Sequence, residues 1–253
     1  MAGNNDSNEQ RFLTEEEKDK FSAEAEKLRA EASLFAAQAR GAEATARRDV
    51  AFAIQAELSL TQSERAEREV LALDKHNQIY FFGAAVGAVT VRDCIERLAL
   101  WTRTKPCCDI EIVFSSPGGS VIDGLVLFDY IQGIRRAGHY VTTSTLGWAA
   151  SMAGILLQAG NNRIMAPESW LLIHEVSLVV GGKIGDIEDE MQWVKRVQER
   201  ILDIFAKRSK QAAADGTATK PLTREALRRG WKRKDWWISS DEALKYGLVD
   251  EIR

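Results

Sequence analysis

Short apolar segments alternate with amphipathic ones along the last two-thirds of the chain, and this alternation limits the fold more than any other feature. Residues 79–82, 110–114 and 140–146 have the length and apolar content of buried strands. Residues 90–101 and 121–136, which lie between them, carry apolar side chains at helical spacing. Because parallel strands need a crossover, usually a helix, this order predicts a parallel sheet with helices on its faces.

The remainder of the chain continues the pattern. Two more short strands are expected at 163–166 and 170–173. A strongly amphipathic helix is expected after the glycine-rich segment 179–185, with its apolar face running to Phe205. Residues 211–222 have the composition of a mobile linker. The last expected elements are a short helix at 223–229, an apolar return at 235–238, a helix at 239–246 capped by Gly247 and a strand at 248–252.

A long helical arm is expected ahead of this domain. Residues 14–73 are rich in Ala, Glu and Arg and contain no Pro, and Thr14 with Glu17 forms a capping-box pattern. Beyond Ala46 the heptad pattern shifts by four residues, and Gly41 costs about 1 kcal/mol relative to Ala, so we expect two helical pieces. The heptad seam is made of Phe21, Ala25, Leu28, Ala32, Phe35, Ala39, Ala42 and Ala46.

The arm has two interpretations. An oligomerisation or scaffold-binding arm would use the apolar seam against a partner helix. A solvated, charge-laced helix lying on its own domain would need no partner. We expect residues 1–13 to be disordered, residues 14–73 to form the separable arm, and residues 77–253 to form the second domain.

Composition and charge exclude several classes of function. A net charge of −3 gives no bias toward nucleic acid or anionic membranes, and we interpret the basic run 228–234 as a solvated or subunit-facing patch. No apolar stretch is long enough to cross a bilayer, and residues 1–10 lack the apolar core of a signal peptide, so we expect a cytosolic protein. No GxxxxGK[ST] pattern occurs, so we expect no nucleotide and no other cofactor.

Cysteine usage points away from disulfides and metals. The three cysteines are Cys94, Cys107 and Cys108, and no CxxC spacing occurs among them. We interpret them as reduced thiols, and no metal site is expected.

One stretch has the features of a nucleophile site. Gly147–Gly154 is rich in small residues and is predicted to be a turn that leads into a buried helix, with Ser151 in the first helical turn. Unpaired N–H groups and the positive end of the helix dipole favour developing negative charge there. The simpler interpretation is a serine N-cap on a core helix.

Two other features would complete such a site. Gly118 and Gly119 follow a predicted strand, and a residue without Cβ lets a peptide N–H approach a ligand closely, although Pro-Gly-Gly also commonly makes a simple turn. Among the three histidines, His174 ends a predicted strand and is the one best placed to share a sheet edge with Ser151. A structural role is the ordinary alternative for such a histidine.

From residue 79 to the C-terminus the sequence resembles the Clp peptidases, the proteolytic subunits of ATP-dependent Clp proteases. Five groups of residues occur in the order of that family. They are Ser116–Val121, Ala149–Met152, Ile173-His174, Gly181–Glu188 and the stretch Glu242-Ala243 to Asp250.

The resemblance implies a fold and a set of roles. The fold would be that of the Clp peptidase and crotonase group, an α/β spiral of ββα units, with a projecting handle at about 175–210. Ser151 would be the nucleophile, His174 the general base and Asp235 the acid that orients the imidazole. The remaining implied positions are oxyanion donors at Gly119 and Met152 and substrate-strand contacts at Gly118, Gly181 and Gly182.

The resemblance also implies partners. Family members form rings of seven subunits that pair through their handles, so a homo-oligomer acting on protein or peptide substrates is expected. An unfoldase ATPase would be the partner of a cellular member. The arm, Trp148 in place of the usual Gln, and Glu175-Val176 in place of Gln-Pro are departures. They resemble divergent phage-encoded members that mature capsids, whose partners would be scaffold or shell proteins in the host cytoplasm.

Two alternatives to a serine endopeptidase remain. A crotonase-like acyl-CoA enzyme would share the fold and the type of oxyanion hole but would not need a Ser-His-Asp set. A non-catalytic assembly factor would act through the helical arm alone.

Overall fold

The structure is a computed structural model that describes residues 14–177 and 179–253. Its contacts divide the chain into two compact units, Met1–Glu69 and Val70–Arg253. The predicted disordered segment 1–13 lies outside the described residues.

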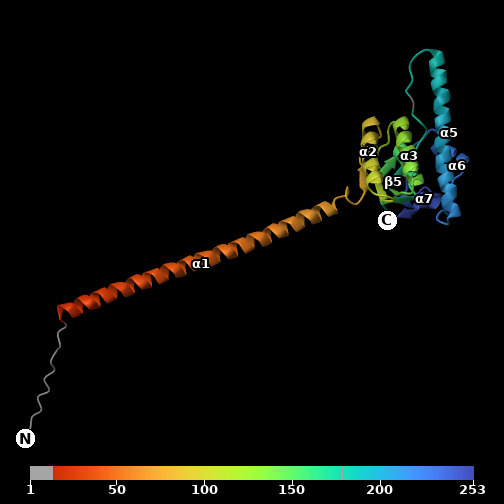
Figure 1. Cartoon of the computed structure of the whole chain (residues 1–253). Coiled ribbons are helices and arrows are strands. Elements are labelled where there is room, and N and C mark those ends of the chain that lie inside the picture. Colours follow the sequence, from red (N-terminus) through yellow and green to blue (C-terminus); the bar gives the residue numbers. More distant parts are fainter. Residues whose placement is uncertain (1–13, 178) are drawn as a thin grey trace, which may run out of the picture. The chain divides into compact units, whose positions relative to one another are not determined.

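Helix α1 is a single continuous helix from Glu15 to Ala72, 58 residues long (Figure 1). Its start is the predicted capping box: Thr14 N donates to Glu17 Oε2 at 2.9 Å and Glu17 N donates to Thr14 Oγ1 at 3.3 Å. The prediction of two helical pieces is wrong, because one glycine costs about 1 kcal/mol and its neighbours are strong helix formers. No residue of α1 is buried.

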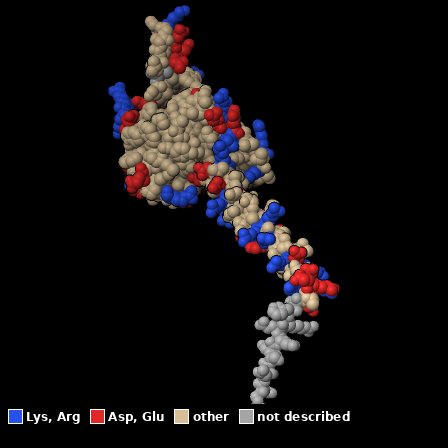
Figure 2. All heavy atoms as spheres, turned by 90° about the vertical axis from the view of Figure 1, so that its left-hand side faces the viewer, with Lys and Arg blue, Asp and Glu red and all other residues tan. Residues whose placement is uncertain are grey.

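Acidic and basic side chains are interspersed along α1, as Figure 2 shows. Four ion pairs at i,i+3 or i,i+4 spacing join them, and each such pair stabilises an isolated helix by about 0.2–0.5 kcal/mol. The charged residues therefore help to keep an unburied helix folded. Among the described residues, no helix is both long enough and apolar enough to pass through a bilayer.

The second unit is built on a seven-stranded sheet. The path β1-β2-β3-β4-β7 is parallel throughout. Strand β5 pairs in parallel with the far end of β3, and β6 pairs antiparallel with β5. The strands are β1 (Ile79–Phe82), β2 (Asp109–Ser116), β3 (Tyr140–Ala150), β4 (Asn162–Met165), β5 (Trp170–Ile173), β6 (Trp236–Ser239) and β7 (Glu251–Ile252).

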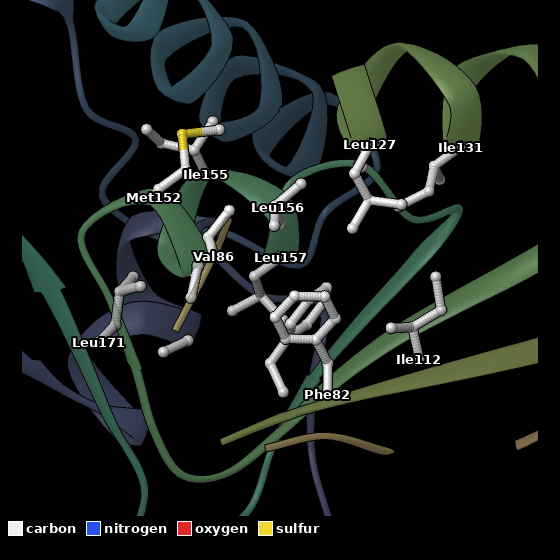
Figure 3. Packing of buried hydrophobic residues seen from close by; sticks show 14 of the residues in the cluster. Phe82, Val86, Ile112, Leu127, Ile131, Met152, Ile155, Leu156, Leu157 and Leu171 are labelled. Carbon is white, nitrogen blue, oxygen red and sulfur yellow. The ribbon is translucent and has the colours of Figure 1, made fainter. Parts of the chain in front are cut away.

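Helices follow the strands in the predicted alternation, and the α/β fold class is confirmed. Apolar side chains of β2, α3 and α4 meet in the core, where Ile112, Leu127 and Leu156 are each 0% exposed (Figure 3). The helices are α2 (Ala88–Thr104), α3 (Val121–Arg136), α4 (Met152–Leu157), α5 (Ile184–Ala214), α6 (Arg224–Trp231) and α7 (Ser240–Tyr246).

Helix α5 has a free half and an anchored half. Its buried residues begin at Val194, and the preceding turns project from the domain in Figure 1. The predicted linker 211–222 starts too early, since residues 211–214 continue the helix. Alanines are strong helix formers, and Ala212 is buried, so this end of α5 is held by packing as well as by propensity.

Strand β3 differs most from expectation. Residues 147–150 are strand residues and not the predicted turn, because Trp148, Ala149 and Ala150 pair with β5. The register of β2 against β3 shifts between Phe114 and Ser116. Pairing with β5 therefore keeps β3 extended up to Ala150, the residue before Ser151. The final strand, in contrast, is confined to β7 and is shorter than predicted.

Candidate active site

Ser151 joins β3 to α4 in a backbone conformation that few residues other than glycine adopt, with φ 54° and ψ −120°. Its main chain is fixed on both sides: Ser151 N donates to Leu172 O at 2.9 Å, and Gly154 N donates to Ser151 O at 3.0 Å. Ser151 occupies the N-cap position of α4, but its hydroxyl makes no capping hydrogen bond. The hydroxyl is thus available for another task, and a strained serine between a strand and a helix is typical of nucleophile sites.

A cavity of about 450 Å³ opens in front of Ser151. His174, Gly119 and Met152 line the same cavity, so four of the predicted site residues face one space. Much of the remaining wall is apolar and is made of Val121, Ile155, Ile201, Phe205 and Trp231. An apolar pocket with a few polar groups is what a binding site for a peptide side chain requires.

The Gly118–Gly119 loop lies directly against the serine turn. Gly118 has φ 86° and Gly119 has φ 147°. A Cβ atom at Gly118 would lie 2.5 Å from the main-chain oxygen of Ala150 and 2.8 Å from the main-chain nitrogen of Met152. Gly118 therefore permits a contact with this turn that no other residue type would allow.

Two main-chain N–H groups at this contact are free. In the described part of the chain, neither Gly119 N nor Met152 N donates a hydrogen bond to another protein group. The loop itself is fixed by Val86, whose N donates to Gly118 O at 2.8 Å and whose O accepts from Ser120 N at 2.8 Å. Gly119 and Met152 line the cavity together with Ser151, and two free amides beside a hydroxyl are what the binding of an oxyanion needs.

Ser116 supports the loop from below, a role that the sequence did not reveal. Its side chain is 0% exposed, its hydroxyl donates to Ala84 O at 2.6 Å, and Gly118 N donates to its oxygen at 3.2 Å. The only signal in the sequence was its place in the Ser-Pro-Gly-Gly motif.

His174 follows directly after β5, and sheet register brings Asp235 beside it. Ile173 pairs with Trp236, so the antiparallel pairing, continued by one residue, sets His174 opposite Asp235. The two residues belong to the same face of the sheet. Even so, Asp235 is exposed, and across residues 14–177 and 179–253 no hydrogen bond joins it to His174.

The His174 ring is instead oriented by the main chain. Its Nδ1 lies 2.5 Å from the carbonyl oxygen of Glu175. Because a carbonyl oxygen can only accept, Nδ1 carries the proton and Nε2 is left as the basic nitrogen. The Glu175 side chain accepts from Arg233 N at 3.0 Å, which ties this segment to the chain that precedes β6.

The remaining histidines and the cysteines do not contribute to the cavity. His139 is a core residue whose Nδ1 accepts from Cys108 N at 3.2 Å, and His76 is exposed. Burial raises the pKa of the Cys94 thiol far above its usual range, so Cys94 stays protonated. Within the described residues, no three His, Cys, Asp or Glu side chains are grouped so that they could hold a metal ion.

Gly181 and Gly182 are not part of the cavity lining. They precede the start of α5, and Gly182 has φ 145°. They lie in the segment that leads from His174 to the projecting half of α5, as Figure 1 shows for the chain between β5 and α5.

Comparison with known proteins agrees with this fold. A family model described as Clp protease matches residues 61–253, and the chain belongs to that family. Membership supports peptidase activity, and Clp proteases generally form oligomeric rings. A relative in Deinococcus radiodurans, described as the proteolytic subunit of ATP-dependent Clp protease, is 29% identical over 197 residues. The alignment covers 76% of this chain and 89% of that protein.

Proposed function

We propose that the protein is a serine endopeptidase with Ser151 as nucleophile and His174 as general base. The observation that carries the proposal is the conformation of Ser151, whose uncapped hydroxyl shares one cavity with His174 and with two free amides. A serine hydroxyl attacks a peptide only when a neighbouring base takes its proton, and the proposed pair supplies both groups.

The reaction would follow from these positions. Nε2 of His174 accepts the Ser151 proton as Oγ attacks the peptide carbonyl carbon. The carbonyl oxygen becomes an oxyanion that accepts hydrogen bonds from Gly119 N and Met152 N. His174 then returns the proton to the leaving amine, and water repeats the sequence on the acyl-enzyme.

Asp235 is proposed as the acid that orients and stabilises His174. Support comes from sheet register, which sets the two residues opposite each other at the end of β5 and β6. A carboxylate bound to Nδ1 stabilises the imidazolium better than a neutral carbonyl does. The exposed Asp235 side chain would therefore displace the Glu175 carbonyl from Nδ1 in the working enzyme.

The substrates are proposed to be extended protein segments. Gly118, Gly181 and Gly182 would offer main-chain groups to such a segment as an added strand. The working form is proposed to be a ring of this chain, heptameric or a pair of heptamers. Its partner would be either an unfoldase ATPase or capsid and scaffold proteins, the second being favoured by the fully unburied α1.

Active-site labelling followed by peptide hydrolysis tests the proposal. A fluorophosphonate probe should modify Ser151 in the native chain, and mass spectrometry should locate the adduct at that residue. Ser151→Ala and His174→Ala should each lower kcat by about 10⁴-fold or more without unfolding the chain.

Retention of a tenth of the activity in either variant, with the adduct elsewhere, would refute the assignment. Asp241→Ala, at an exposed site in the first turn of α7, is the matched control and should keep full activity. Thioester hydrolysis that survives Ser151→Ala would point instead to the crotonase-like alternative.

A further inference from the structure

The heptad seam of α1 is uncovered and lies on one unbroken helix. Phe21, Leu28 and Phe35 are 65%, 61% and 75% exposed, and no residue of α1 is buried. The helix continues through Gly41, so the seam is not interrupted within residues 21–46. Its length falls within the three to four heptads, about 21–28 residues, that a coiled coil needs.

Large and small residues occupy different positions of this seam. Position a of the heptad always holds alanine, whereas position d holds a large apolar residue in three of its four occurrences. Read along the chain, positions d and a in turn are Phe21, Ala25, Leu28, Ala32, Phe35, Ala39, Ala42 and Ala46. The seam therefore needs a partner that places a small residue opposite each large one.

A second copy of α1 that runs antiparallel is such a partner, because position a of one helix then faces position d of the other. When the two helices cross at the middle of the seam, four kinds of layer form and each occurs twice. These layers are Phe21 with Ala46, Ala25 with Ala42, Leu28 with Ala39, and Ala32 with Phe35. Most of the layers thus pair one large residue with one alanine, so that facing side chains can interdigitate at a uniform helix spacing.

Other arrangements of two copies fit less well. In a parallel pair equal residues meet, so layers of two large residues alternate with layers of two alanines. A spacing that suits one of these layers leaves a gap or a clash in the next. Moving the antiparallel register by one heptad brings either Lys18 or Asp49 into the seam. The register that covers the whole seam is therefore also the one that keeps charged residues out of it.

Charge favours the antiparallel arrangement as well. Residues 15–31 contain seven acidic and four basic residues, a net charge of −3. The antiparallel pair sets them against residues 36–52, which contain three basic and two acidic residues, a net charge of +1. A parallel pair would set the acidic segments side by side. Its flanking pair of Glu24 with Arg29 would offset little of that repulsion, since exposed ion pairs contribute little.

We propose that α1 binds α1 of a second copy of this chain, antiparallel, through the seam of residues 21–46. Beyond the seam, the two helices would continue in opposite directions. At a rise of about 1.5 Å per residue, the Ala72 residues of the two copies would lie about 115 Å apart. The paired arms would therefore connect two copies of the unit Val70–Arg253 that are far from each other, whereas a parallel pair would hold both units at one end.

The pairing does not depend on the peptidase function, because it uses no residue of the cavity. It also leaves part of α1 uncovered. Val50, Ile54 and Leu58 are exposed apolar residues beyond the seam, and the capsid or scaffold proteins proposed above would bind there.

Cysteine cross-linking of the full chain tests the pairing. Ala25→Cys and Ala42→Cys would be introduced together, with Cys107→Ser to remove the exposed native thiol. Within one helix these two positions are about 25 Å apart, so a disulfide between them must join two copies. Mild oxidation should give 25–42 links in at least about fivefold excess over 25–25 and 42–42 links, as measured by mass spectrometry of the digested dimer.

Two further sets of variants serve as controls. Ala23→Cys with Ala44→Cys lies at the same level on the opposite face of α1 and should give about a tenth of that yield or less. Ala39→Leu should lower the yield of 25–42 links by about threefold or more, because the new side chain would meet Leu28 of the second copy in a filled layer. Adding Leu28→Ala should restore the yield. In a parallel pair Ala39→Leu would instead fill an alanine layer and raise the total yield of links.

Three results would overturn the proposal: a majority of 25–25 and 42–42 links, an equal yield from the outward-facing cysteines, or no link at all. Should the cysteine chain fail to fold, sedimentation of the native chain and of Ala39→Leu at one concentration decides, and equal masses would overturn the pairing. Fluorophosphonate labelling of Ser151 in the same samples tests the peptidase function separately.

Discussion

At position 151 the side chain and the backbone have opposing requirements. The residue adopts φ 54° and ψ −120°, a conformation that costs about 1–3 kcal/mol for a residue with Cβ. Glycine would relieve that cost but would remove the hydroxyl. Serine at this position is therefore less favourable for stability than glycine would be, as expected if its hydroxyl has the catalytic role proposed above.

This conflict predicts how two inactive variants differ in stability. Ser151→Gly and Ser151→Ala both remove the hydroxyl, so both should lack activity and fluorophosphonate labelling. Because only glycine accepts φ 54° without strain, Ser151→Gly should be more stable than Ser151→Ala by about 1 kcal/mol, as measured by urea unfolding. Equal free energies of unfolding would mean that the turn carries no strain.

The Gly118 contact predicts a loss of catalysis from one methyl group. In Gly118→Ala the new Cβ would press on Ala150 O and on Met152 N, one of the two proposed oxyanion donors. Displacing that donor should lower kcat by about 100- to 1,000-fold while KM changes less. Gly133→Ala, in α3 with no atom within 4 Å of its Cβ, is the control and should leave kcat unchanged. A full kcat in Gly118→Ala would show that the loop yields without moving the donor.

Two groups could orient the His174 ring, the carboxylate of Asp235 and the main-chain carbonyl of Glu175, and a substitution at the exposed Asp235 separates their contributions. Asp235→Asn should lower kcat/KM by about 10²- to 10⁴-fold if its carboxylate stabilises the His174 imidazolium. Asp241→Asn on α7 is the control. Activity within a factor of two of the native chain would assign the orienting role to the Glu175 carbonyl, which already meets Nδ1.

At the level of elements, the local signals predicted most of the fold. Helix α3 has its predicted bounds because Ser120 is a good N-cap, accepting from Asp123 N at 3.3 Å. Helix α7 ends where Gly247, the predicted cap, takes φ 70°. Both signals act within a few residues, so they can be read from the sequence.

Features that depend on distant pairing were not predictable in this way. The second half of β3 looked like a turn because its residues are small, and only its pairing with β5 keeps it extended. The placement of Trp148, Trp170 and Trp237 on one face likewise depends on register across three strands. The motif predicted that Ser151, His174, Gly119 and Met152 would lie together, and they line one cavity. Their catalytic roles remain predictions.

A buried charge pair ties β4 to the segment before β7 and predicts a large stability effect. Arg163 is 1% exposed, and its guanidinium donates to Asp250, to Gln158 Oε1 at 2.7 Å and to Gly247 O at 2.9 Å. Arg163→Ala would leave the partly buried Asp250 carboxylate without its main partner and should cost about 3–5 kcal/mol in urea unfolding.

The control for Arg163 is an exposed pair of the same kind. Arg92 lies 3.9 Å from Glu96 on α2, with both side chains mostly exposed, so Arg92→Ala should cost less than about 1 kcal/mol. Similar costs for the two variants would contradict the structural role given to Arg163.

On the scale of the whole molecule, the two units have different sources of stability. The unit Val70–Arg253 has a continuous apolar core, whereas α1 in the other unit has no buried residue and depends on propensity and surface ion pairs. Its exposed apolar residues include Phe21, Leu28 and Phe35 of the heptad seam. An apolar seam of this length gains stability only when a partner helix covers it.

This contrast predicts the result of removing the arm. Deletion of residues 1–69 should leave a folded, soluble protein that still labels at Ser151 and cleaves small peptides, because the core and the cavity lie in the other unit. What should change is association: light scattering should give a larger assembly for the native chain than for the shortened one where the arm joins copies of this chain, and equal assemblies where the arm only recruits other partners. Substituting Phe21, Leu28 and Phe35 by Gln in the full chain should reproduce the effect of deletion, since the seam supplies the contact. An insoluble or unlabelled remainder would show that α1 is needed for the fold of the second unit, and the arm would then be an integral part of the peptidase.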